Sequence, residues 1–436
     1  MGDRATAKGL HVLLPTLGSA GDVNPMIALG RALGRRGHRA TVITNEAFAG
    51  AAQSAGLEFI ALGTIAEAEA IIADPRLWHP VKGFQCIAER VLIPNLTRLY
   101  DIIACHAGPG VVVAAPGTCL GARLAQEKLG VPLATVHLQP AMIRSLADSG
   151  RQGRIVLGPG VPRPIKKAVF WMIDRFFVDR HLLPELNAVR ARLGLRPVAR
   201  VFGGYLHSTQ LVIGLFPEWF APPQPDWPPQ THLTGFVLYD GGGEPEVSAA
   251  AERFLDAGTP PVLFTPGSAT TGQERYFRES VEACRLAGLR GMFVTNFPAQ
   301  LPLDLPPSVE AFSYLPFSRI LPRCAALVCH GGIGTLAQAI NAGIPSLVVP
   351  NAHDQPDNAL RIERLGLGRS VYPDRYKAAA VARLLSEITG SSPMRQRSRH
   401  YAGKIDTEAT LGRTCELIEQ LGTSGAPPET NREPVC

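Results

Sequence analysis

The stretch Cys329-His330-Gly331-Gly332-Ile333-Gly334-Thr335 decides the fold of this chain, together with Asp354-Gln355, which begin nineteen residues after Thr335. The apolar run Ala325 to Val328 before it predicts a buried strand, and Leu336 to Ile340 after it has a helical pattern. A glycine-rich turn between a strand and a helix points backbone N–H groups at an anion. His330 adds a directional donor, cationic if protonated, and Thr335 can cap the helix or bond to a phosphate oxygen. The stretch therefore predicts a pyrophosphate site.

A second polar loop supports the prediction of a ligand site. The apolar strand Ser346 to Pro350 is followed by Asn351-Ala352-His353-Asp354-Gln355, which opens another helix. Two neighbouring strands would thus end in polar loops at one edge, where open α/β sheets bind ligands. The alternative is a plain strand-to-helix turn in which glycines supply positive φ, and for an isolated Gly-Gly-x-Gly this reading would be the better one.

Composition bounds the class of protein. The chain has 436 residues, 46% of them apolar, which is enough for two domains with full cores. The net charge is +6, and no dense Lys/Arg tract interleaves with aromatic residues, so we expect no nucleic-acid partner. The mild basic excess favours anionic small molecules or an acidic membrane surface. Eight scattered cysteines without a CxxC pair indicate core residues in a reducing compartment.

Targeting and membrane signals are weak. Met1 to Gly9 is short and polar, and we expect no secretory signal. No apolar run approaches the ~20 residues needed to cross a bilayer. We expect a cytoplasmic protein, with peripheral association at the inner membrane surface as a further expectation. The segment Ile165 to Phe177 is apolar with basic flanks. It predicts either a helix packed on its own domain or an apolar wall for a greasy substrate that touches the membrane, with Phe170 and Trp171 on the acceptor side.

Strands and helices alternate in both halves, which predicts an α/β fold of two Rossmann-like, doubly wound parallel-sheet domains facing across a cleft. The first half is expected to begin with a strand at His11 to Leu17 and a helix at Pro25 to Arg36. A long helical stretch around Phe84 to Cys105 follows, and the second half restarts at Pro261.

Proline and glycine content sets the expected domain boundaries. Six prolines lie between Pro217 and Pro229, and Gly241-Gly242-Gly243 follow, which indicates an interdomain connector. The prediction is an N-terminal domain over 1–216, a linker over 217–243, a domain with the predicted nucleotide-diphosphate site over 244–400, and a C-terminal helix with a flexible tail over 401–436.

A second group of candidate residues follows the first strand, in Gly18-Ser19-Ala20-Gly21-Asp22-Val23-Asn24-Pro25. The small residues Gly18, Ser19 and Gly21 allow a ligand to approach the backbone closely, and Pro25 fits a first helical turn. Asp22 would stand at the mouth of this sheet, facing the cleft opposite His330. The residues alone leave it equally well explained as a loop or capping carboxylate stabilised by the helix dipole.

A third site is predicted at Thr265-Pro266-Gly267-Ser268-Ala269-Thr270, at the end of the first strand of the second half. Gly267 and the hydroxyl of Ser268 can meet phosphate oxygens. No Asp-x-Asp and no metal-ligand spacing occur in the chain, so we expect neither a metal ion nor a cofactor to hold the diphosphate. A Gly-x-Ser-x-Gly elbow, which would favour hydrolysis, is absent from the sequence.

These motifs resemble those of the inverting nucleotide-sugar glycosyltransferases of the GT-B fold, the UDP-glycosyltransferase-like family, over nearly the whole chain. The shared signature is His-Gly-Gly-x-Gly-Thr followed by Asp-Gln. The resemblance implies that His330 and the amides of Gly331 to Thr335, including Gly332 and Gly334, hold the diphosphate. It also implies that Asp354 and Gln355 bind the donor-sugar hydroxyls. On the same ground, the domain over 1–216 would bind the acceptor, and the nucleotide-diphosphate sugar would be a co-substrate rather than a cofactor. Within Tyr314-Leu315-Pro316-Phe317, Leu315 and Pro316 would contact the nucleobase.

Within this family the chain is similar to the rhamnosyltransferases of rhamnolipid synthesis, through the stretches Asp74 to Trp78, Phe216 to Pro222 and Ala352 to Gln355. Many plant members carry a catalytic histidine in the first loop, whereas this chain has none between His11 and His38. The resemblance therefore implies that Asp22 is the catalytic base. To deprotonate a hydroxyl well, its carboxylate needs a raised pKa.

The expected activity is an inverting, metal-independent hexosyl transfer to the hydroxyl of a hydrophobic acceptor. The first choice of donor is dTDP-rhamnose, and the first choice of acceptor is a hydroxy-fatty acyl lipid. An alternative is a UDP-glucose-type enzyme acting on a sterol, carotenoid or macrolide. Alternatives from other classes are a nucleotide-sugar epimerase and a non-catalytic nucleotide-sugar-binding protein.

Overall fold

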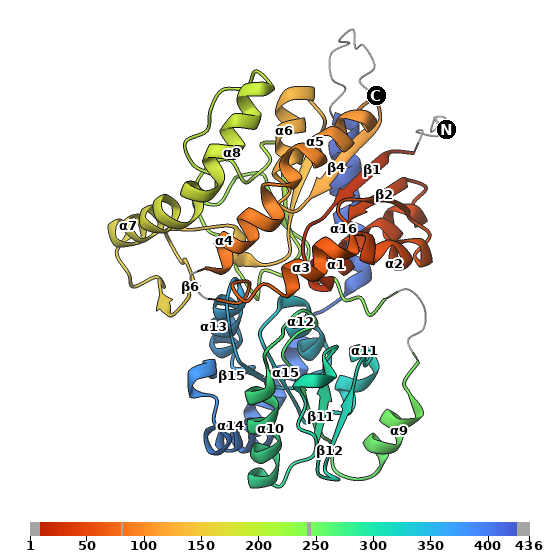
Figure 1. Ribbon diagram of the computed structural model, residues 1–436, viewed down its shortest axis with the longest axis vertical. Helices are drawn as coiled ribbons and strands as arrows, with labels where there is room; N and C mark the ends of the chain where they lie inside the picture. Colours follow the sequence, from red (N-terminus) through yellow and green to blue (C-terminus); the bar gives the residue numbers. More distant parts are fainter. Residues whose placement is uncertain (1–8, 80–81, 242–245, 425–436) are drawn as a thin grey trace.

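Two parallel β-sheets organise the chain, one in each half (Figure 1). The computed structural model describes residues 9–79, 82–241 and 246–424. Within these ranges the first sheet has seven strands in the order β3-β2-β1-β4-β5-β8-β9, and the second has six in the order β12-β11-β10-β13-β14-β15. All strand pairs in both sheets are parallel. The predicted fold class of two doubly wound α/β domains is confirmed.

The strands of the first sheet are β1 (His11–Pro15), β2 (Arg39–Thr44), β3 (Glu58–Ala61), β4 (Val111–Ala115), β5 (Leu133–His137), β8 (Leu211–Gly214) and β9 (Thr231–Leu233). The strands of the second are β10 (Val262–Thr265), β11 (Gly291–Val294), β12 (Val309–Phe312), β13 (Ala326–Cys329), β14 (Ser346–Val348) and β15 (Gly368–Ser370). A separate antiparallel hairpin is formed by β6 (Arg151–Gln152) and β7 (Ile155–Val156).

The helices of the first half are α1 (Ala20–Arg35), α2 (Ala49–Ser54), α3 (Ile65–Ile72), α4 (Gly83–Ile87), α5 (Asn95–His106), α6 (Leu120–Leu129), α7 (Arg163–Ile173) and α8 (Asp179–Arg192). Those that follow are α9 (Ala249–Asp256), α10 (Glu274–Ala287), α11 (Phe317–Ile320), α12 (Ile333–Asn341), α13 (Gln355–Leu365), α14 (Ala378–Gly390), α15 (Ser392–Ala402) and α16 (Thr407–Ser424). Short π-helical segments cover Ala88–Leu92 and Asp174–Val178. Short 3-10 turns cover Glu46–Phe48, Pro140–Met142, Pro298–Gln300, Leu321–Arg323 and Pro373–Arg375.

Local sequence explains these elements. All residues of β4 and β13 are buried, as expected for strands covered by helices on both faces. Helices α6, α10 and α13 end at Gly130, Gly288 and Gly366, which adopt the left-handed conformation that glycine accommodates best.

Two predicted helix boundaries differ from the structure. Helix α1 begins at Ala20 rather than at Pro25, because Ser19 and Asp22 start the helix one turn earlier and Pro25 lies in its second turn. The stretch predicted as one long helix around Phe84 to Cys105 is divided. Pro94, which has no N–H to donate, precedes the start of α5 at Asn95.

The connection between the halves also differs from its prediction. Strand β9 lies within the range 217–243 that the sequence assigns to a linker, and it pairs with β8 to extend the first sheet. Backbone pairing with β8 gives these residues a structural place that proline content alone does not indicate. The predicted glycines at 242–243 lie outside the described residues.

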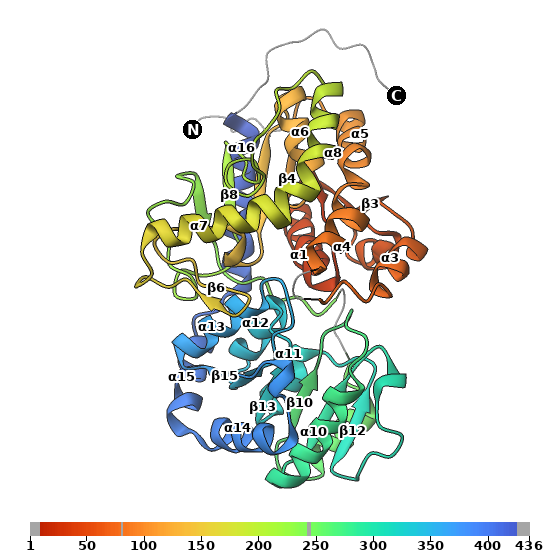
Figure 2. The same cartoon turned by 60° about the vertical axis from the view of Figure 1, so that its left-hand side comes forward.

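Helix α16 returns to the first half and lies along its sheet, as both views show (Figures 1 and 2). Leu411, Cys415 and Ile418 belong to the same buried cluster as Val12 of β1. Arg36, the residue that follows α1, forms an ion pair with Glu419 at 2.6 Å. The C-terminal helix, predicted within 401–436, therefore packs in the core of the N-terminal domain. The predicted flexible tail from residue 425 lies outside the described residues.

No helix in residues 9–79, 82–241 or 246–424 is both long and apolar enough to span a bilayer.

Candidate active site

A cavity of about 1900 Å³ lies between the two halves and receives residues from both. Its lining includes most of the residues predicted from the sequence. From the first half these are Gly18, Ser19, Gly21 and Asp22; from the second they are Gly267, Ser268, Leu315, His330, Gly332, Gly334, Thr335, Asp354 and Gln355. Four predicted residues do not line it. They are Gly331, Pro316, Phe170 and Trp171.

The predicted acceptor-side pair needs correction. Phe170 is buried under the guanidinium of Arg144, which lies 4.8 Å from the centre of its ring, and Trp171 is exposed on the outside of α7. Instead, Ile173 and Phe177, from the same apolar segment, line the cavity. Both lie toward the C-terminal end of that segment, and its apolar pattern alone does not reveal which of its turns reaches the cavity.

His330 follows β13 and is sandwiched between two glycines. A Cβ on Gly332 would lie 2.5 Å from its Nε2 atom, and one on Gly267 would lie 3.0 Å from its Cε1 atom. Both positions therefore require glycine while the ring stays in place. The strands β10 and β13 pair with Thr265 opposite Cys329, so the turns bearing Gly267 and His330 start side by side at the strand-order switch point.

The imidazole of His330 is held as a neutral group. Burial lowers its pKa to about 4. Its Nδ1 atom is buried and has no partner among the described residues. Of the two forms that the sequence leaves open, the neutral one is therefore favoured, and it offers one N–H donor to a ligand.

The N-terminus of α12 is open. Gly332 is its N-cap residue, no side chain caps it, and its first turn carries no acidic residue. Its free N–H groups and its dipole favour an anion at this end. Asn358 of α13 fixes this turn, because its side-chain amide donates to the carbonyl of Gly331 at 2.9 Å.

The loop predicted to read the sugar is ordered by its own side chains. The Oε1 atom of Gln355 accepts the N–H groups of Asn351 and Ala352 at 2.8 and 3.2 Å, which leaves its amide NH₂ to donate to a ligand. Oδ2 of Asp354 accepts from the Asn358 amide at 2.7 Å. Burial, with a smaller contribution from the charge of Asp22, raises the pKa of Asp354 to about 7.

Asp22 lies in the first turn of α1, where its Oδ2 atom accepts the N–H of Ser19 at 2.9 Å and its hydroxyl at 3.3 Å. Burial raises the pKa of Asp22, and the two bonds from Ser19 oppose that rise. The sequence left open whether Asp22 caps its helix or faces the cleft, and the structure shows both. Its carboxylate accepts the N–H of Ser19 at the helix start, and the residue also lines the cavity.

The remaining predicted loops also reach the cavity. Ser268 is exposed to it, whereas the neighbouring Thr270 hydroxyl is buried and has no partner among the described residues. Leu315 is 3% exposed and still contributes to the lining. Beside it, the hydroxyl of Tyr314 donates to the Asp240 carbonyl at 2.8 Å. This bond attaches the interdomain connector to the predicted nucleobase loop.

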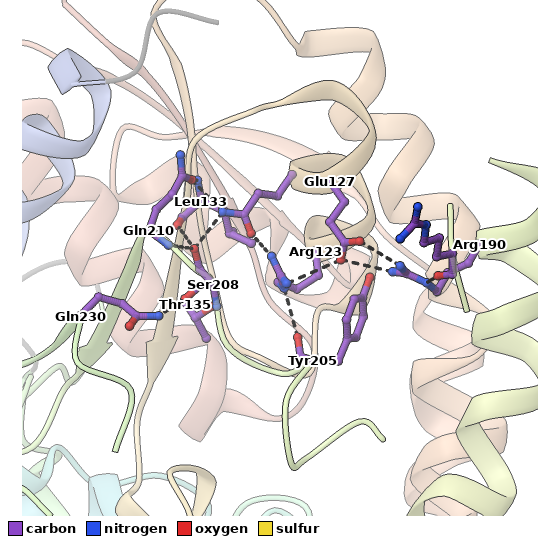
Figure 3. A network of polar contacts seen from close by, with 11 residues as sticks. Arg123, Glu127, Leu133, Thr135, Arg190, Tyr205, Ser208, Gln210 and Gln230 are labelled. Atoms are coloured by element: carbon purple, nitrogen blue, oxygen red, sulfur yellow. Dashed lines mark hydrogen bonds and ion pairs between the residues drawn. The ribbon is translucent and has the colours of Figure 1, made fainter. Parts of the chain in front are cut away.

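A buried polar network of the first half holds a segment that lines the cavity (Figure 3). Arg123 Nε donates to the carbonyl of Tyr205 at 3.1 Å, and Gln126 Nε2 donates to the hydroxyl of Ser208 at 2.9 Å. Leu206, between these two anchored residues, lines the cavity. The network therefore fixes the position of an apolar wall.

Asn358 is a site residue that sequence reasoning missed. Its amide joins the carbonyl of Gly331 to the carboxylate of Asp354, so it holds the two predicted ligand loops together. The available signal was its position one helical turn after Asp354. In the described part of the chain, no group of three or more His, Cys, Asp or Glu residues is arranged to hold a metal ion.

Family models match both halves of the chain. Residues 12–147 match the model for the glycosyltransferase family 28 N-terminal domain. Residues 293–414 match the model for the erythromycin biosynthesis protein CIII-like C-terminal domain. The second match covers the turn with His330 and the loop with Asp354.

Whole-chain relatives are glycosyltransferases. The chain is 30% identical to O-mycaminosyltylonolide 6-deoxyallosyltransferase of Streptomyces fradiae, over 94% of this chain and 97% of that protein. It is 26% identical to sterol 3-beta-glucosyltransferase UGT80A2 of Arabidopsis thaliana, over 84% of this chain and 58% of that protein.

Solved structures share the fold at lower identity. The kitacinnamycin glycotransferase aligns with a TM-score of 0.71 and 19% identity, covering 95% of this chain and 99% of that one. Spinosyn rhamnosyltransferase SpnG complexed with thymidine diphosphate aligns with a TM-score of 0.64 and 20% identity, covering 93% and 100%. At this level of identity the likeness concerns the fold alone.

Proposed function

Because the chain belongs to the GT-B glycosyltransferases of the family 28 and erythromycin biosynthesis protein CIII-like type, we propose that it transfers a hexose, with inversion, from a nucleotide-diphosphate sugar to the hydroxyl of a hydrophobic acceptor. One observation carries this proposal. Asp22 of the first half lines the same cavity as His330 and Asp354 of the second. A base and a leaving-group site thus face one reaction space.

In the proposed reaction the Asp22 carboxylate takes the proton of the acceptor hydroxyl. The acceptor oxygen forms a bond to the anomeric carbon, the bond from that carbon to the diphosphate oxygen breaks, and its electron pair leaves with the diphosphate. Burial raises the pKa of Asp22, which brings it closer to the value a general base needs near neutral pH.

The departing diphosphate is stabilised by the His330 N–H and the open N-terminus of α12. These donors are fixed before the reaction, so they stabilise the developing charge without reorganisation. We extend the proposal to a transfer that needs no metal ion, because the helix N-terminus and the imidazole N–H supply stabilisation of the required sign.

For the donor, dTDP-rhamnose is the first choice. A spinosyn rhamnosyltransferase with bound thymidine diphosphate shares the fold and supports this choice. The Asp354 carboxyl and the Gln355 NH₂ can bond to neighbouring hydroxyls of a hexose. UDP-glucose is the alternative, and the sterol glucosyltransferase supports it.

The acceptor is proposed to be an apolar, hydroxyl-bearing natural product or lipid. Phe84, Ile173 and Phe177 contribute an apolar wall to the cavity. The deoxyallosyltransferase relative supports a macrolide as the acceptor, and the sterol glucosyltransferase relative supports a sterol. A hydroxy-fatty acyl lipid, as in rhamnolipid synthesis, is favoured by the exposed apolar surface that begins at the same wall.

That surface, the apolar patch, consists of side chains at least 40% exposed on the hairpin, α7 and the following π segment: Ile155, Val156, Ile165, Trp171, Met172, Phe176 and Phe177. Ile155 and Phe177 also line the cavity. Exposed basic residues flank the patch, and the acidic residues of this segment, Asp174 and Asp179, are buried. Since apolar side chains with basic flanks suit an anionic bilayer surface, peripheral membrane association is part of the proposal.

The activity is tested by thermal stabilisation with dTDP-rhamnose, UDP-glucose and their diphosphates, followed by turnover of the best binder with 3-hydroxydecanoyl lipid, a macrolide aglycone and a sterol. Stabilisation and glycoside formation are expected. Binding without any glycoside would indicate a non-catalytic sugar-nucleotide binder. Isomerised sugar formed without an acceptor would indicate an epimerase.

Membrane association is tested by co-sedimentation with vesicles of phosphatidylglycerol and phosphatidylcholine, compared with phosphatidylcholine alone. Phe176→Glu is expected to abolish binding to the anionic vesicles, and salt to weaken it. The matched control is Leu286→Glu, at an exposed leucine on α10 of the other half. Equal binding of both variants would contradict a role for the patch.

A further inference from the structure

A short segment of the first half touches two ligand loops of the second. The indole Nε1 of Trp78 donates to the carbonyl of Ala269 at 3.1 Å, in the loop that bears Ser268. His353, in the loop that bears Asp354, has its Nε2 atom 3.2 Å from the carbonyl of Leu77. The rings of Trp78 and His353 meet edge to face with centroids 5.5 Å apart. We call Leu77, Trp78, Ala269 and His353 the cleft latch.

The first-half side of the latch is firmly built. Asp74 accepts the backbone N–H of Arg76 at 2.9 Å and its guanidinium Nη2 at 2.8 Å, and Glu89 pairs with the same guanidinium at 3.0 Å. Gly83 allows the close approach, because a Cβ there would lie 2.7 Å from the Leu77 carbonyl and 3.3 Å from His353 Cε1. These contacts hold the Leu77 carbonyl toward the second half.

On the other side, His353 has an unusual backbone. Its φ is 59°, which makes it the one non-glycine residue with positive φ in the described part of the chain. Such a conformation is uncommon for a side-chain-bearing residue, and surrounding contacts must hold it. Leu77 and Trp78 of the other domain contact its ring, and within its own loop the Gln355 N–H closes the turn by donating to the Ala352 carbonyl at 3.3 Å.

All three loops have anchors within their own domain. Asn296 donates to the Ser268 carbonyl at 3.2 Å, and Asn358 holds the turn of His330. Gln355 and Asn358 likewise bond within the loop of Asp354. In that last loop a side chain, the ring of His353 directly before Asp354, also contacts the first half.

We propose that the cleft latch is a positioning device for the donor sugar: Trp78 and Leu77 of the acceptor domain fix His353 so that Asp354 and Gln355 face the sugar. This inference rests on the proposed function, because it assumes a nucleotide-sugar donor. It predicts that removing the latch weakens binding of the sugar part of the donor and spares binding of the diphosphate. A merely structural contact between domains would change both affinities in parallel.

The test measures dissociation constants by calorimetry for two pairs of probes, dTDP-rhamnose with dTDP and UDP-glucose with UDP. Trp78→Phe removes the indole N–H and keeps an aromatic ring, and His353→Ala removes the ring contacts. Each is expected to weaken the preferred nucleotide sugar about 5-fold to 30-fold, the usual effect of one lost polar contact. Affinity for the matching diphosphate should change less than about 2-fold.

Two further variants sharpen the test. Trp227→Phe makes the same chemical change at a tryptophan whose indole nitrogen has no partner among the described residues, and both affinities should stay at the wild-type level. His353→Asn should recover part of the lost sugar affinity relative to His353→Ala, since asparagine adopts positive φ readily.

Parallel losses for sugar nucleotide and diphosphate, or no loss in Trp78→Phe and His353→Ala, would overturn the latch. Because the readout is a ratio within one variant, partial unfolding shifts both ligands together and does not mimic the expected result. A wild-type protein that binds none of the four probes would instead contradict the proposed function.

Discussion

Two turns with similar sequences end in different chemistry. Gly18-Ser19-Ala20-Gly21-Asp22 and Gly331-Gly332-Ile333-Gly334-Thr335 each follow a strand at the switch point of their sheet and start a helix. Each opens with a glycine of positive φ, 132° at Gly18 and 96° at Gly331. The third helical residue is Asp22 in the first turn and Thr335 in the second.

The third helical residue decides whether the N–H groups of each turn are available to a ligand. The carboxylate of Asp22 bends back to the N–H of Ser19, so the first helix N-terminus already holds an anion of its own. The second has no acidic residue in its first turn, and its N–H groups remain available. Similar backbone geometry therefore gives an internally filled site in one half and a site for an external diphosphate in the other.

The largest effect is expected when the filled turn loses its charge. Asp22→Asn keeps an oxygen that can accept the Ser19 N–H and removes the proposed base, so turnover should fall about 10²-fold to 10⁴-fold. Affinity for dTDP should be retained, because the donor is held by the other turn. Steady-state kinetics and calorimetry on the same sample check both statements, and near-normal turnover would remove Asp22 as the base.

The open turn should respond differently. His330→Ala removes a fixed donor to the leaving group, and kcat/KM is expected to fall about 10²-fold to 10³-fold. Here dTDP affinity should fall as well, which distinguishes this variant from Asp22→Asn. His400→Ala, at an exposed histidine on α15, is the control. A correctly folded His330→Ala protein with ordinary turnover would contradict the phosphate role.

Thr335→Asp gives the second turn the acidic residue of the first. It places a carboxylate at the position that Asp22 occupies in α1, where it can reach the Gly332 N–H. Unfolding should become more costly by about 0.3–1 kcal/mol, because an acid favours a helix N-terminus. Affinity for dTDP should drop about 10-fold or more through competition and charge repulsion.

Thr335→Asn is the matched neutral variant of that experiment. It has nearly the same shape as the aspartate and should lose much less affinity for dTDP. Calorimetry and chemical denaturation of the two proteins separate the effect of charge from that of size. Equal losses in both would show that the hydroxyl of Thr335, rather than the absence of an acid, matters.

The smallest effect concerns pH. Burial raises the pKa of Asp354 to about 7, above its ordinary value of 3.8, so between these values the native state holds a proton that the unfolded state has released. The free energy of unfolding should therefore fall as pH rises through this window. Asp354→Asn should remove this contribution, whereas Asp304→Asn, in an exposed loop, should not. Denaturation at a series of pH values checks the slope, and an unchanged slope in Asp354→Asn would contradict the assignment.

Much of the fold could be predicted because its signals are local. Apolar runs such as Ala326 to Val328 can be buried strands only when helices cover both faces, and glycines mark the ends of several helices. The errors fall where distant contacts decide. Strand β9 follows a proline-rich stretch and pairs with β8, which lies before that stretch. Helix α16, near the end of the described chain, packs on a core that includes Val12 of β1.

The candidate site divides in the same way. His330, Asp354 and Asp22 belong to short motifs and were named from the sequence; the structure brings them to one cavity, and their roles stay predictions. The role proposed for Trp78 could not be predicted from the sequence, because its contact with Ala269 joins residues 191 positions apart. Phe170 and Trp171 do not line the cavity, because the chain meets it one turn later, at Ile173 and Phe177, and the apolar pattern is the same along the whole segment.

The return of α16 to the first half has a consequence for protein engineering. The polypeptide passes between the domains twice, once before α9 and once between α15 and α16. Leu411, Cys415 and Ile418 complete the core around β1, so cutting the chain after α15 would expose that core. In a chimaera made to exchange donor preference with a relative, the second half must be transplanted as an insertion with two junctions, leaving α16 with the acceptor domain it completes.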